Sequence, residues 1–307
     1  MERTMADTIE GIVPIIVTPF DEGLALDEAS LQRHVEFCLA AGAGGLVGPA
    51  NASEFATLSD DERRRWIQVV VSSADGAPVV ASVTSGHLMP AIDLARYAID
   101  AGVAAIMSMP PPLLKPDTAG CVDYFTRLAE AIAPIPLIVQ NYAPPLGTPL
   151  TSATLAQLCQ RVDNIEYIKE ELPPETRMIT STLAAVGTAC RGIFGGQGGI
   201  YLIDEFRRGA IGNMPGGHLT DVLVDVWRQL QEGEESAARR IHHQLLPLMT
   251  LERLYGVAIY KQILQRRGIF TTARRRAPGG VLDAFDLYEL DAALACVEPL
   301  YRIGKGN

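Results

Sequence analysis

The sequence predicts a (β/α)8 TIM barrel followed by three helices. Short apolar runs rich in valine and isoleucine recur at regular intervals along the 307 residues, and amphipathic stretches of helical period separate them. The runs are continuous rather than alternating, which is typical of parallel strands covered on both faces. The repeat predicts a barrel over residues 1–230 and a helical extension over residues 231–307.

The elements follow one another in a regular order. Strands are expected at residues 11–17, 44–48, 78–83, 104–109, 136–140, 165–169, 191–195 and 210–214. Helical periodicity marks residues 30–41, 88–101 and 124–133 between them, and residues 234–249, 253–266 and 283–302 after them. Ser59 and Glu62 form a capping box for a further helix, and Gly102 is expected to end another. An open doubly wound sheet would favour a GxGxxG turn after the first strand, where this chain has Thr18-Pro19-Phe20.

The net charge, the hydropathy and the pattern of histidines and cysteines argue against several classes of function. A net charge of −10 argues against nucleic acid as a partner. No apolar run reaches the ~18 residues that a membrane helix needs, and the N-terminal residues show no signal-peptide core, so a cytoplasmic protein is expected. The histidines and cysteines form no ligand pattern, so no metal is expected. The basic run 274–276 is interpreted as a solvated loop, with an inter-subunit contact as the alternative.

Lys169 is one of only four lysines, and it ends the apolar run 165–169. An ammonium on a buried strand is costly unless it is paired or deprotonated. A lysine whose pKa is lowered in this way can attack a carbonyl and form a Schiff base. The alternative is a lysine whose charge reaches water at the strand end. The barrel prediction favours the Schiff base, because barrel active sites lie at the carboxyl ends of strands.

The same rule selects the polar and glycine-rich segments that follow the other strands. They are Thr18, residues 51–54, 84–85, 110–112, 140–142, 195–197 and 214–217. Side-chain alternation puts Glu170 on the face of its strand opposite Lys169, where we expect it to pair with an outer helix. The run 195–199 lies where barrels often bind phosphate, although we favour a tight turn against the substrate.

Five landmarks together resemble one superfamily of barrels. They are Thr18-Pro19-Phe20, the segment 53–59, Met109-Pro110-Pro111, Ile168-Lys169-Glu170 and Gly209-Ala210-x-Gly212. In this combination they resemble the dihydrodipicolinate synthase / N-acetylneuraminate lyase superfamily, along nearly the whole chain. The resemblance implies that Lys169 forms an imine with a 2-oxo acid. It also implies a homotetramer built as a dimer of dimers, or a homodimer.

The chain departs from the synthases and lyases of that superfamily at several positions. Residues 50–54 read Ala-Asn-Ala-Ser-Glu where those enzymes carry Gly-Thr-Thr-Gly-Glu or a close variant. Gln140 stands where a proton-relay tyrosine usually ends strand five, and Leu113 where a neighbouring subunit would lend another. Leu146 replaces the arginine that holds the second substrate of dihydrodipicolinate synthase. Tyr142 could serve as the relay only if its loop is shifted by two residues.

One branch of the superfamily shows this variant. Asn51-x-Ser53-Glu54, Val139-Gln140-Asn141 and Gly212-x-Met214-x-Gly216-Gly217 look like the L-2-keto-3-deoxyarabonate dehydratases. The resemblance implies dehydration of a 2-keto-3-deoxy sugar acid to 2-oxoglutarate semialdehyde through the Lys169 imine, without a cofactor. A pyruvate-dependent aldolase or synthase is the alternative. A non-catalytic barrel that binds 2-oxo acids is a second one.

The expected site combines a catalytic set with a substrate-binding set. Lys169, Gln140 and Asn51 are the expected catalytic residues. The expected substrate-binding residues are Ala52, Ser53, Glu54, Tyr142, Gly196, Gln197 and Met214. Ser53 and nearby backbone N–H groups suit the substrate carboxylate, although Ser53 could be a simple turn residue. Asn51 and Gln140 could equally be satisfied polar residues of the barrel core, and Glu54 a base or a cap of the backbone turn.

Overall fold

The computed structural model describes residues 9–303. Contacts divide the chain into two compact units. The first unit contains Pro78–Met214 together with Ile9 and Glu10, and the second contains Gly11–Ala77 and the described residues from Pro215 onward. This division rests on contacts rather than on the repeat, so the barrel boundary at residue 230 stays a prediction.

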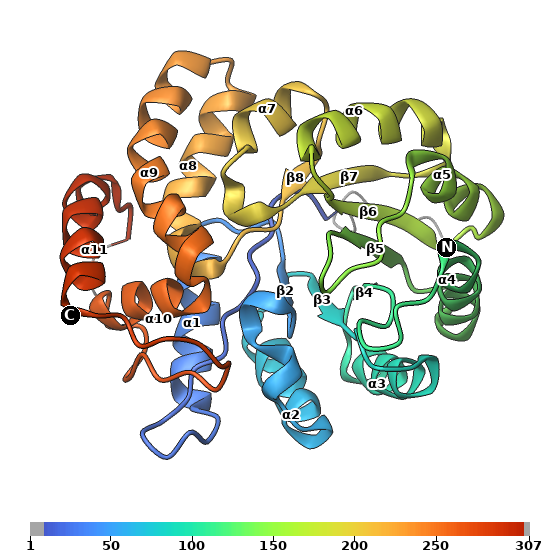
Figure 1. The fold of residues 1–307 in the computed structure, drawn as a ribbon, viewed down its shortest axis with the longest axis horizontal. Coiled ribbons are helices and arrows are strands. Elements are labelled where there is room, and N and C mark those ends of the chain that lie inside the picture. Colours follow the sequence, from blue (N-terminus) through green and yellow to red (C-terminus); the bar gives the residue numbers. More distant parts are fainter. Residues whose placement is uncertain (1–8, 304–307) are drawn as a thin grey trace. The chain divides into compact units, whose positions relative to one another are not determined.

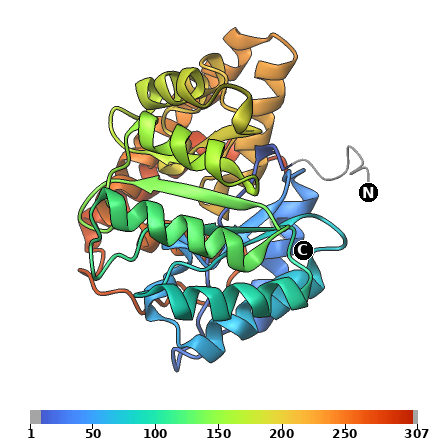
Figure 2. The same ribbon diagram turned by 90° about the vertical axis from the view of Figure 1, so that its right-hand side faces the viewer.

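The first unit contains six parallel strands that pair in chain order. They are β3 (Val79–Ser82), β4 (Ala105–Ser108), β5 (Leu137–Tyr142), β6 (Ile165–Glu171), β7 (Gly192–Gly195) and β8 (Gly212–Asn213). The connecting helices are α3 (Leu88–Ala101), α4 (Thr118–Ile132), α5 (Ser152–Arg161), α6 (Glu175–Val186) and α7 (Leu202–Arg207). Figures 1 and 2 show these helices on the outer side of the strands.

The local sequence explains these elements. All four residues of β3 and of β4 are buried, as expected for strands covered on both faces. Side chains cap α4 and α5, where Asp117 accepts from the Gly120 N–H and Thr151 from the Thr154 N–H. Gly102 ends α3 with a φ of 99°, as predicted. Strands β5 and β6 each run two residues further than expected, so Gln140 and Lys169 lie within strands rather than at their ends.

The second unit holds two short strands and six α-helices in its described part. The strands are β1 (Gly11–Ile12) and β2 (Leu46–Gly48), and Ile15 forms parallel bridges with Val47 and Gly216. The helices are α1 (Glu28–Ala40), α2 (Asp60–Ser73), α8 (Thr220–Gln231), α9 (Glu235–Tyr255), α10 (Val257–Arg266) and α11 (Ala284–Val297). The predicted capping box of Ser59 and Glu62 opens α2. Helices α9 and α10 meet at Gly256, whose φ is 54°.

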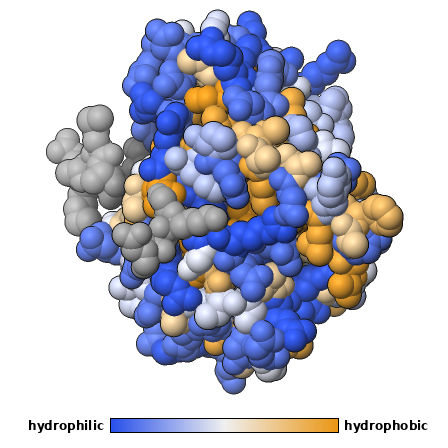
Figure 3. Space-filling view, turned by 90° about the vertical axis from the view of Figure 1, so that its left-hand side faces the viewer, coloured by the Kyte–Doolittle hydropathy of each residue, from blue (hydrophilic) through white to orange (hydrophobic). Residues whose placement is uncertain are grey.

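The surface carries apolar residues near the last helices. Figure 3, which shows the face carrying α11, has apolar patches in a largely hydrophilic surface. Exposed large apolar side chains of this C-terminal part include Leu254, Val281, Phe285 and Tyr288. None of the helices in the described range 9–303 is both long and apolar enough to cross a membrane.

Candidate active site

Lys169 lies in the interior of β6 with a side chain that is only 5% exposed. The strand register places it beside Gln140 on β5 and Phe194 on β7. Its Nζ lies 3.1 Å from Oε2 of Glu171 and forms a salt bridge with that carboxylate. The alternative interpretation, a lysine whose charge reaches water at the end of the strand, does not fit this geometry, because the side chain is buried and paired.

Glu171 connects the predicted residues of the first unit. Its Oε2 also accepts a hydrogen bond from Gln140 Nε2 at 2.7 Å. Its Oε1 accepts from the backbone N–H of Gln197 at 3.1 Å, and Gln197 Nε2 donates to the Glu171 carbonyl at 3.2 Å. Lys169, Gln140 and Gln197 therefore meet at one carboxylate.

Sequence reasoning missed Glu171, although a signal for it was present. Residues two apart on a strand share a face, so Glu171 follows Lys169 on the same side whenever the strand continues. We expected the strand to end at Lys169, and that boundary hid the residue. The alternation rule itself is confirmed by Glu170, which lies on the opposite face and accepts hydrogen bonds from Asn141 Nδ2. Its partner is thus a neighbouring strand rather than the outer helix that we expected.

Two consecutive glycines make room for two carboxylates. A Cβ on Gly196 would lie 2.3 Å from Oε1 of Glu171, and a Cβ on Gly195 would lie 2.1 Å from Oε2 of Glu205. The close approach of a carboxylate therefore requires glycine at both positions. The tight turn that we expected follows at Gln197 and Gly198, whose φ angles are 50° and 69°.

Burial raises the pKa of two glutamates close to this site, Glu170 and Glu205. Burial raises the pKa of Glu170 to about 7, although the Asn141 hydrogen bonds oppose the shift. Burial likewise raises the pKa of Glu205 to about 8, and Glu205 Oε2 accepts from Asn213 Nδ2 at 2.6 Å. Among these three glutamates, Glu171 is the one that is paired with a lysine. The pair of Glu171 and Lys169 therefore combines a proton-accepting carboxylate with a nucleophilic amine.

Tyr142 and Met214 complete the predicted residues of this unit. The register pairs Tyr142 with Glu171, and alternation puts its side chain on the same face of β5 as Gln140, two residues further along. Met214 follows β8, is buried, and donates its backbone N–H to the Gly195 carbonyl at 3.0 Å. The roles of both residues in binding substrate stay predictions.

The remaining predicted residues belong to the second unit and form the strand-two loop, residues 51–54. Asn51 and Ala52 are partly exposed, whereas Ser53 and Glu54 are buried. The Ser53 hydroxyl donates to the Ile16 carbonyl at 2.6 Å, and the Thr18 hydroxyl donates to the Ser53 carbonyl at 2.6 Å. We expected the Ser53 hydroxyl to donate to a substrate carboxylate, but it donates to a backbone carbonyl of the protein instead. This geometry favours the alternative in which Ser53 is a structural turn residue.

Comparisons with known proteins identify relatives over most of the chain. L-2-keto-3-deoxyarabonate dehydratase of Azospirillum brasilense is 31% identical over 297 residues, which cover 94% of this chain and 95% of that protein. The 4-hydroxy-tetrahydrodipicolinate synthase of Methanopyrus kandleri is 31% identical over 255 residues, 80% of this chain and 81% of that protein.

The crystal structure of dihydrodipicolinate synthase from Rhodopseudomonas palustris superimposes with a TM-score of 0.88 at 27% identity, covering 96% of this chain and 100% of that one. This similarity confirms the predicted (β/α)8 barrel with its C-terminal helical extension. Residues 8–296 match the model of the dihydrodipicolinate synthetase family. On the family model and the near full-length relatives together, the chain belongs to the dihydrodipicolinate synthetase family.

Proposed function

We propose that this lyase dehydrates a 2-keto-3-deoxy sugar acid of the L-2-keto-3-deoxyarabonate type to 2-oxoglutarate semialdehyde, through an imine at Lys169. The observation that carries the proposal is the buried pair of Lys169 and Glu171, an amine nucleophile with a proton acceptor 3.1 Å away. The similarity to a dehydratase over 94% of the chain supports this substrate class. The reaction requires no metal and no redox cofactor.

Imine formation uses the pair directly. Lys169 loses its proton to Glu171, and its Nζ attacks the C2 carbonyl of the substrate. The carbonyl oxygen leaves as water, and a protonated C=N bond remains on the lysine. Gln140 donates to Glu171 Oε2 and so fixes the carboxylate that must accept the proton. Gln140 thereby acts through Glu171 as a positioning residue.

Dehydration then follows from the electron demand of the imine. A base removes a C3 proton, the electrons form a C2=C3 enamine, and the C4 hydroxyl leaves as water. Loss of a C5 proton gives an enol, whose tautomerisation produces the C5 aldehyde. Hydrolysis of the imine consumes one water and returns Lys169, so the net change is the loss of one water. Glu171 is our candidate for the base at C3.

Borohydride trapping tests the covalent step. We expect a reduced adduct with pyruvate or a 2-keto-3-deoxy acid, mapped to Lys169 by mass spectrometry and absent from Lys169→Ala. Lys115 is exposed, so Lys115→Ala is the control for non-specific reduction of a lysine and should trap like the wild type. If no 2-oxo acid leaves an adduct on Lys169, the enzymatic proposal fails. Saturable binding without an adduct would support the non-catalytic alternative.

Product analysis separates dehydratase from aldolase. With 2-keto-3-deoxy-pentonate we expect a single five-carbon semialdehyde. Pyruvate together with glycolaldehyde would instead identify an aldolase, which breaks the C3–C4 bond. An aldolase or synthase is the second candidate, because the Methanopyrus synthase is also 31% identical to this chain, over a shorter span.

We also propose that the chain works in the cytoplasm on a small 2-oxo acid as a homotetramer or homodimer. The oligomer is an expectation from the family resemblance. Exposed apolar side chains of the C-terminal part, including Phe285 and Tyr288, support it because they would gain from being covered.

A further inference from the structure

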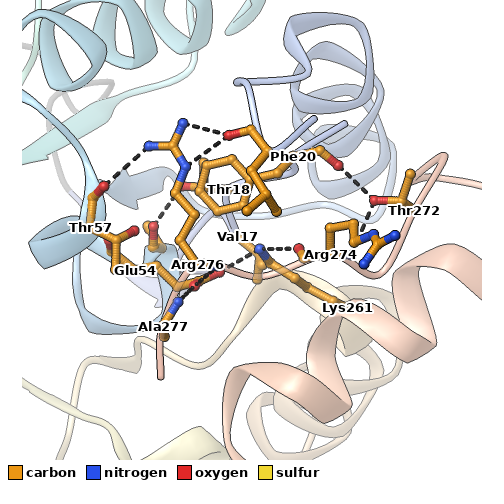
Figure 4. A network of polar contacts seen from close by, with 12 residues as sticks. Val17, Thr18, Phe20, Glu54, Thr57, Lys261, Thr272, Arg274, Arg276 and Ala277 are labelled. Carbon is orange, nitrogen blue, oxygen red and sulfur yellow. Dashed lines mark hydrogen bonds and ion pairs between the residues drawn. The ribbon is translucent and has the colours of Figure 1, made fainter. Parts of the chain in front are cut away.

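The Glu54 carboxylate is fully enclosed by residues of the C-terminal segment. Its side chain is 0% exposed, and Oε1 forms an ion pair with Lys261 of α10, which is also 0% exposed. Oε2 accepts from the backbone N–H groups of Arg276 and Ala277, at 2.9 and 2.5 Å. Figure 4 shows the strand-two loop joined in this way to a helix and a loop more than two hundred residues further along the chain.

We propose that Lys261 and the backbone of Arg276 and Ala277 are positioning elements, which hold the strand-two loop in its substrate-binding conformation through Glu54. The proposal deepens the proposed function and rests on it, together with the sequence predictions that Asn51 is catalytic and that Ala52 binds substrate. These two residues are the partly exposed part of the loop. Glu54 is then an anchor of the loop and not a group that touches substrate.

The backbone of the loop depends on such an anchor. Glu54 has a φ of 55° and a ψ of 37°, a left-handed conformation that is uncommon for residues other than glycine. A strained backbone of this kind persists only where the surroundings hold it. The Glu54 N–H donates to the Asn51 carbonyl at 3.0 Å, and the Thr57 hydroxyl donates to the Glu54 carbonyl at 2.9 Å. A change in the Glu54 backbone would therefore reach Asn51 through this hydrogen bond.

Lys261 is built into a cluster that suits an anchor. Its Nζ donates to the Arg274 carbonyl at 2.8 Å and lies 4.2 Å from the centroid of the Phe20 ring. Burial lowers the pKa of Lys261 to about 8, while the Glu54 carboxylate opposes that shift. The lysine has no solvent-exposed surface, so it does not serve as a second Schiff-base nucleophile for a ligand from solution.

The Arg276 side chain makes several contacts in the same cluster as Lys261 and Glu54. Its guanidinium lies 4.3 Å from the centroid of Phe20, donates to the carbonyls of Leu24 and Thr57, and pairs with Glu62 at 2.6 Å. We interpreted residues 274–276 as a solvated loop, but the Arg276 side chain is only 19% exposed. The contacts of Arg276 fix the backbone N–H groups that face Glu54.

The second unit contains a matched control for removing Lys261. Asp221 is also a buried carboxylate held by one basic side chain, Arg267, and by two consecutive backbone N–H groups, those of Arg302 and Ile303. Lys261→Met and Arg267→Met therefore each leave a buried carboxylate with two backbone donors. The two variants are expected to lose similar stability, but only one touches the strand-two loop.

Steady-state kinetics and hydrogen–deuterium exchange test the proposal on the 307-residue chain. We expect Lys261→Met to raise KM for the 2-oxo acid by about tenfold with a much smaller change in kcat, and to speed exchange in peptides covering residues 50–57. Arg267→Met should leave KM and that exchange unchanged. Equal KM and exchange in Lys261→Met and the wild type, or equal rises in both variants, would overturn the proposal.

If Lys261→Met does not fold, the conservative variant Glu54→Gln provides a second test of the proposal. Glu54→Gln preserves an acceptor for the two backbone donors but removes the charge from the ion pair, and we expect a smaller rise in KM in the same direction. The exchange measurement does not need turnover, so it distinguishes the two proposals. One outcome would separate the two proposals. If the wild type shows no adduct at Lys169, but Lys261→Met exchanges faster at residues 50–57, the proposed function is refuted and the role of Lys261 in holding the loop is supported.

Discussion

At the scale of single residues, the chemistry of this protein centres on one carboxylate with several partners. Glu171 accepts hydrogen bonds from Gln140 and Gln197 and forms a salt bridge with Lys169. A hydrogen-bonded carboxylate beside a buried amine can move a proton without exposing either group to water. The replacement of the usual relay tyrosine by Gln140 is consistent with this, because an amide cannot relay a proton but can orient a group that does.

Replacing Glu171 should separate imine formation from the steps that follow. In Glu171→Gln we expect borohydride to trap an adduct at Lys169 on long incubation, since the variant retains the Lys169 amine. Turnover of the sugar acid should fall by ~10²–10⁴, the usual contribution of a positioned base. The measurement is kcat alongside the yield of reduced adduct.

Glu170→Gln is the control for that experiment. Glu170 occupies the neighbouring position on β6 but lies on the opposite face, where Asn141 and the Leu172 N–H bind it. Its replacement should therefore change kcat much less than that of Glu171. Equal losses in the two variants would show that a general disturbance of β6, and not a lost base, explains the effect.

At the scale of elements, the order and approximate positions of the elements could be predicted, whereas many of their ends could not. The strand expected at residues 11–17 is Gly11–Ile12 in the structure, the helix expected at 124–133 begins at Thr118, and the helix expected to end at 249 runs to Tyr255. Apolar runs locate β3 to β7 because a covered parallel strand is apolar on both faces. Charged residues normally mark the end of such a run, so Glu170 and Glu171 were placed after the strand. The structure includes them in β6 because Asn141, Gln140 and Lys169 satisfy their carboxylates. Such partners lie on another strand and leave no local signal.

Helix α7 supplies a titratable group whose effect on stability can be measured. Glu205 keeps its proton in the folded protein up to about pH 8, whereas the ordinary value is 4.5. Between these values the native state binds more protons than the unfolded state. The free energy of unfolding should thus fall as pH rises through this window, by at most about 1.4 kcal/mol per pH unit for one group.

Glu205→Gln should remove that part of the pH dependence. The Gln side chain cannot titrate and keeps an oxygen to accept from Asn213. We expect urea unfolding at pH 5, 6, 7 and 8 to show a shallower decline than in the wild type, with the largest gain in stability at pH 8. Some decline should remain below about pH 7, since the raised pKa of Glu170 acts in the same direction. Parallel curves for the two proteins would contradict the assignment.

At the scale of the whole molecule, the repeat predicted the fold but not the long-range pairs that hold its loops. The barrel follows from alternating strand and helix periods, which are local properties. The pairing of Glu54 with Lys261 joins residues from distant parts of the sequence, and no local pattern around either residue points to the other. The same holds for Ser53, whose hydroxyl partner is a backbone carbonyl that any residue could provide.

The C-terminal helix leads to a prediction about assembly. Phe285 and Tyr288 are 82% and 70% exposed and lie three residues apart on α11, so they share one face of that helix. Burying a large apolar side chain stabilises a protein by ~1.5–3 kcal/mol, and two exposed aromatic side chains do not contribute this free energy in full. A second copy of the chain would cover this face, and a two-fold interface would use it on both partners.

Light scattering after size exclusion tests that assembly. We expect the wild type to have two or four times the chain mass of 33.1 kDa. Phe285→Asp combined with Tyr288→Asp should lower the mass or make it depend on concentration, because two carboxylates would be forced into an apolar contact. Met89→Asp is the control, since Met89 is another exposed apolar residue, at 57%, but lies at the start of α3. A monomeric wild type would contradict the assembly itself, and an unchanged mass in the double variant would exclude α11 from the interface.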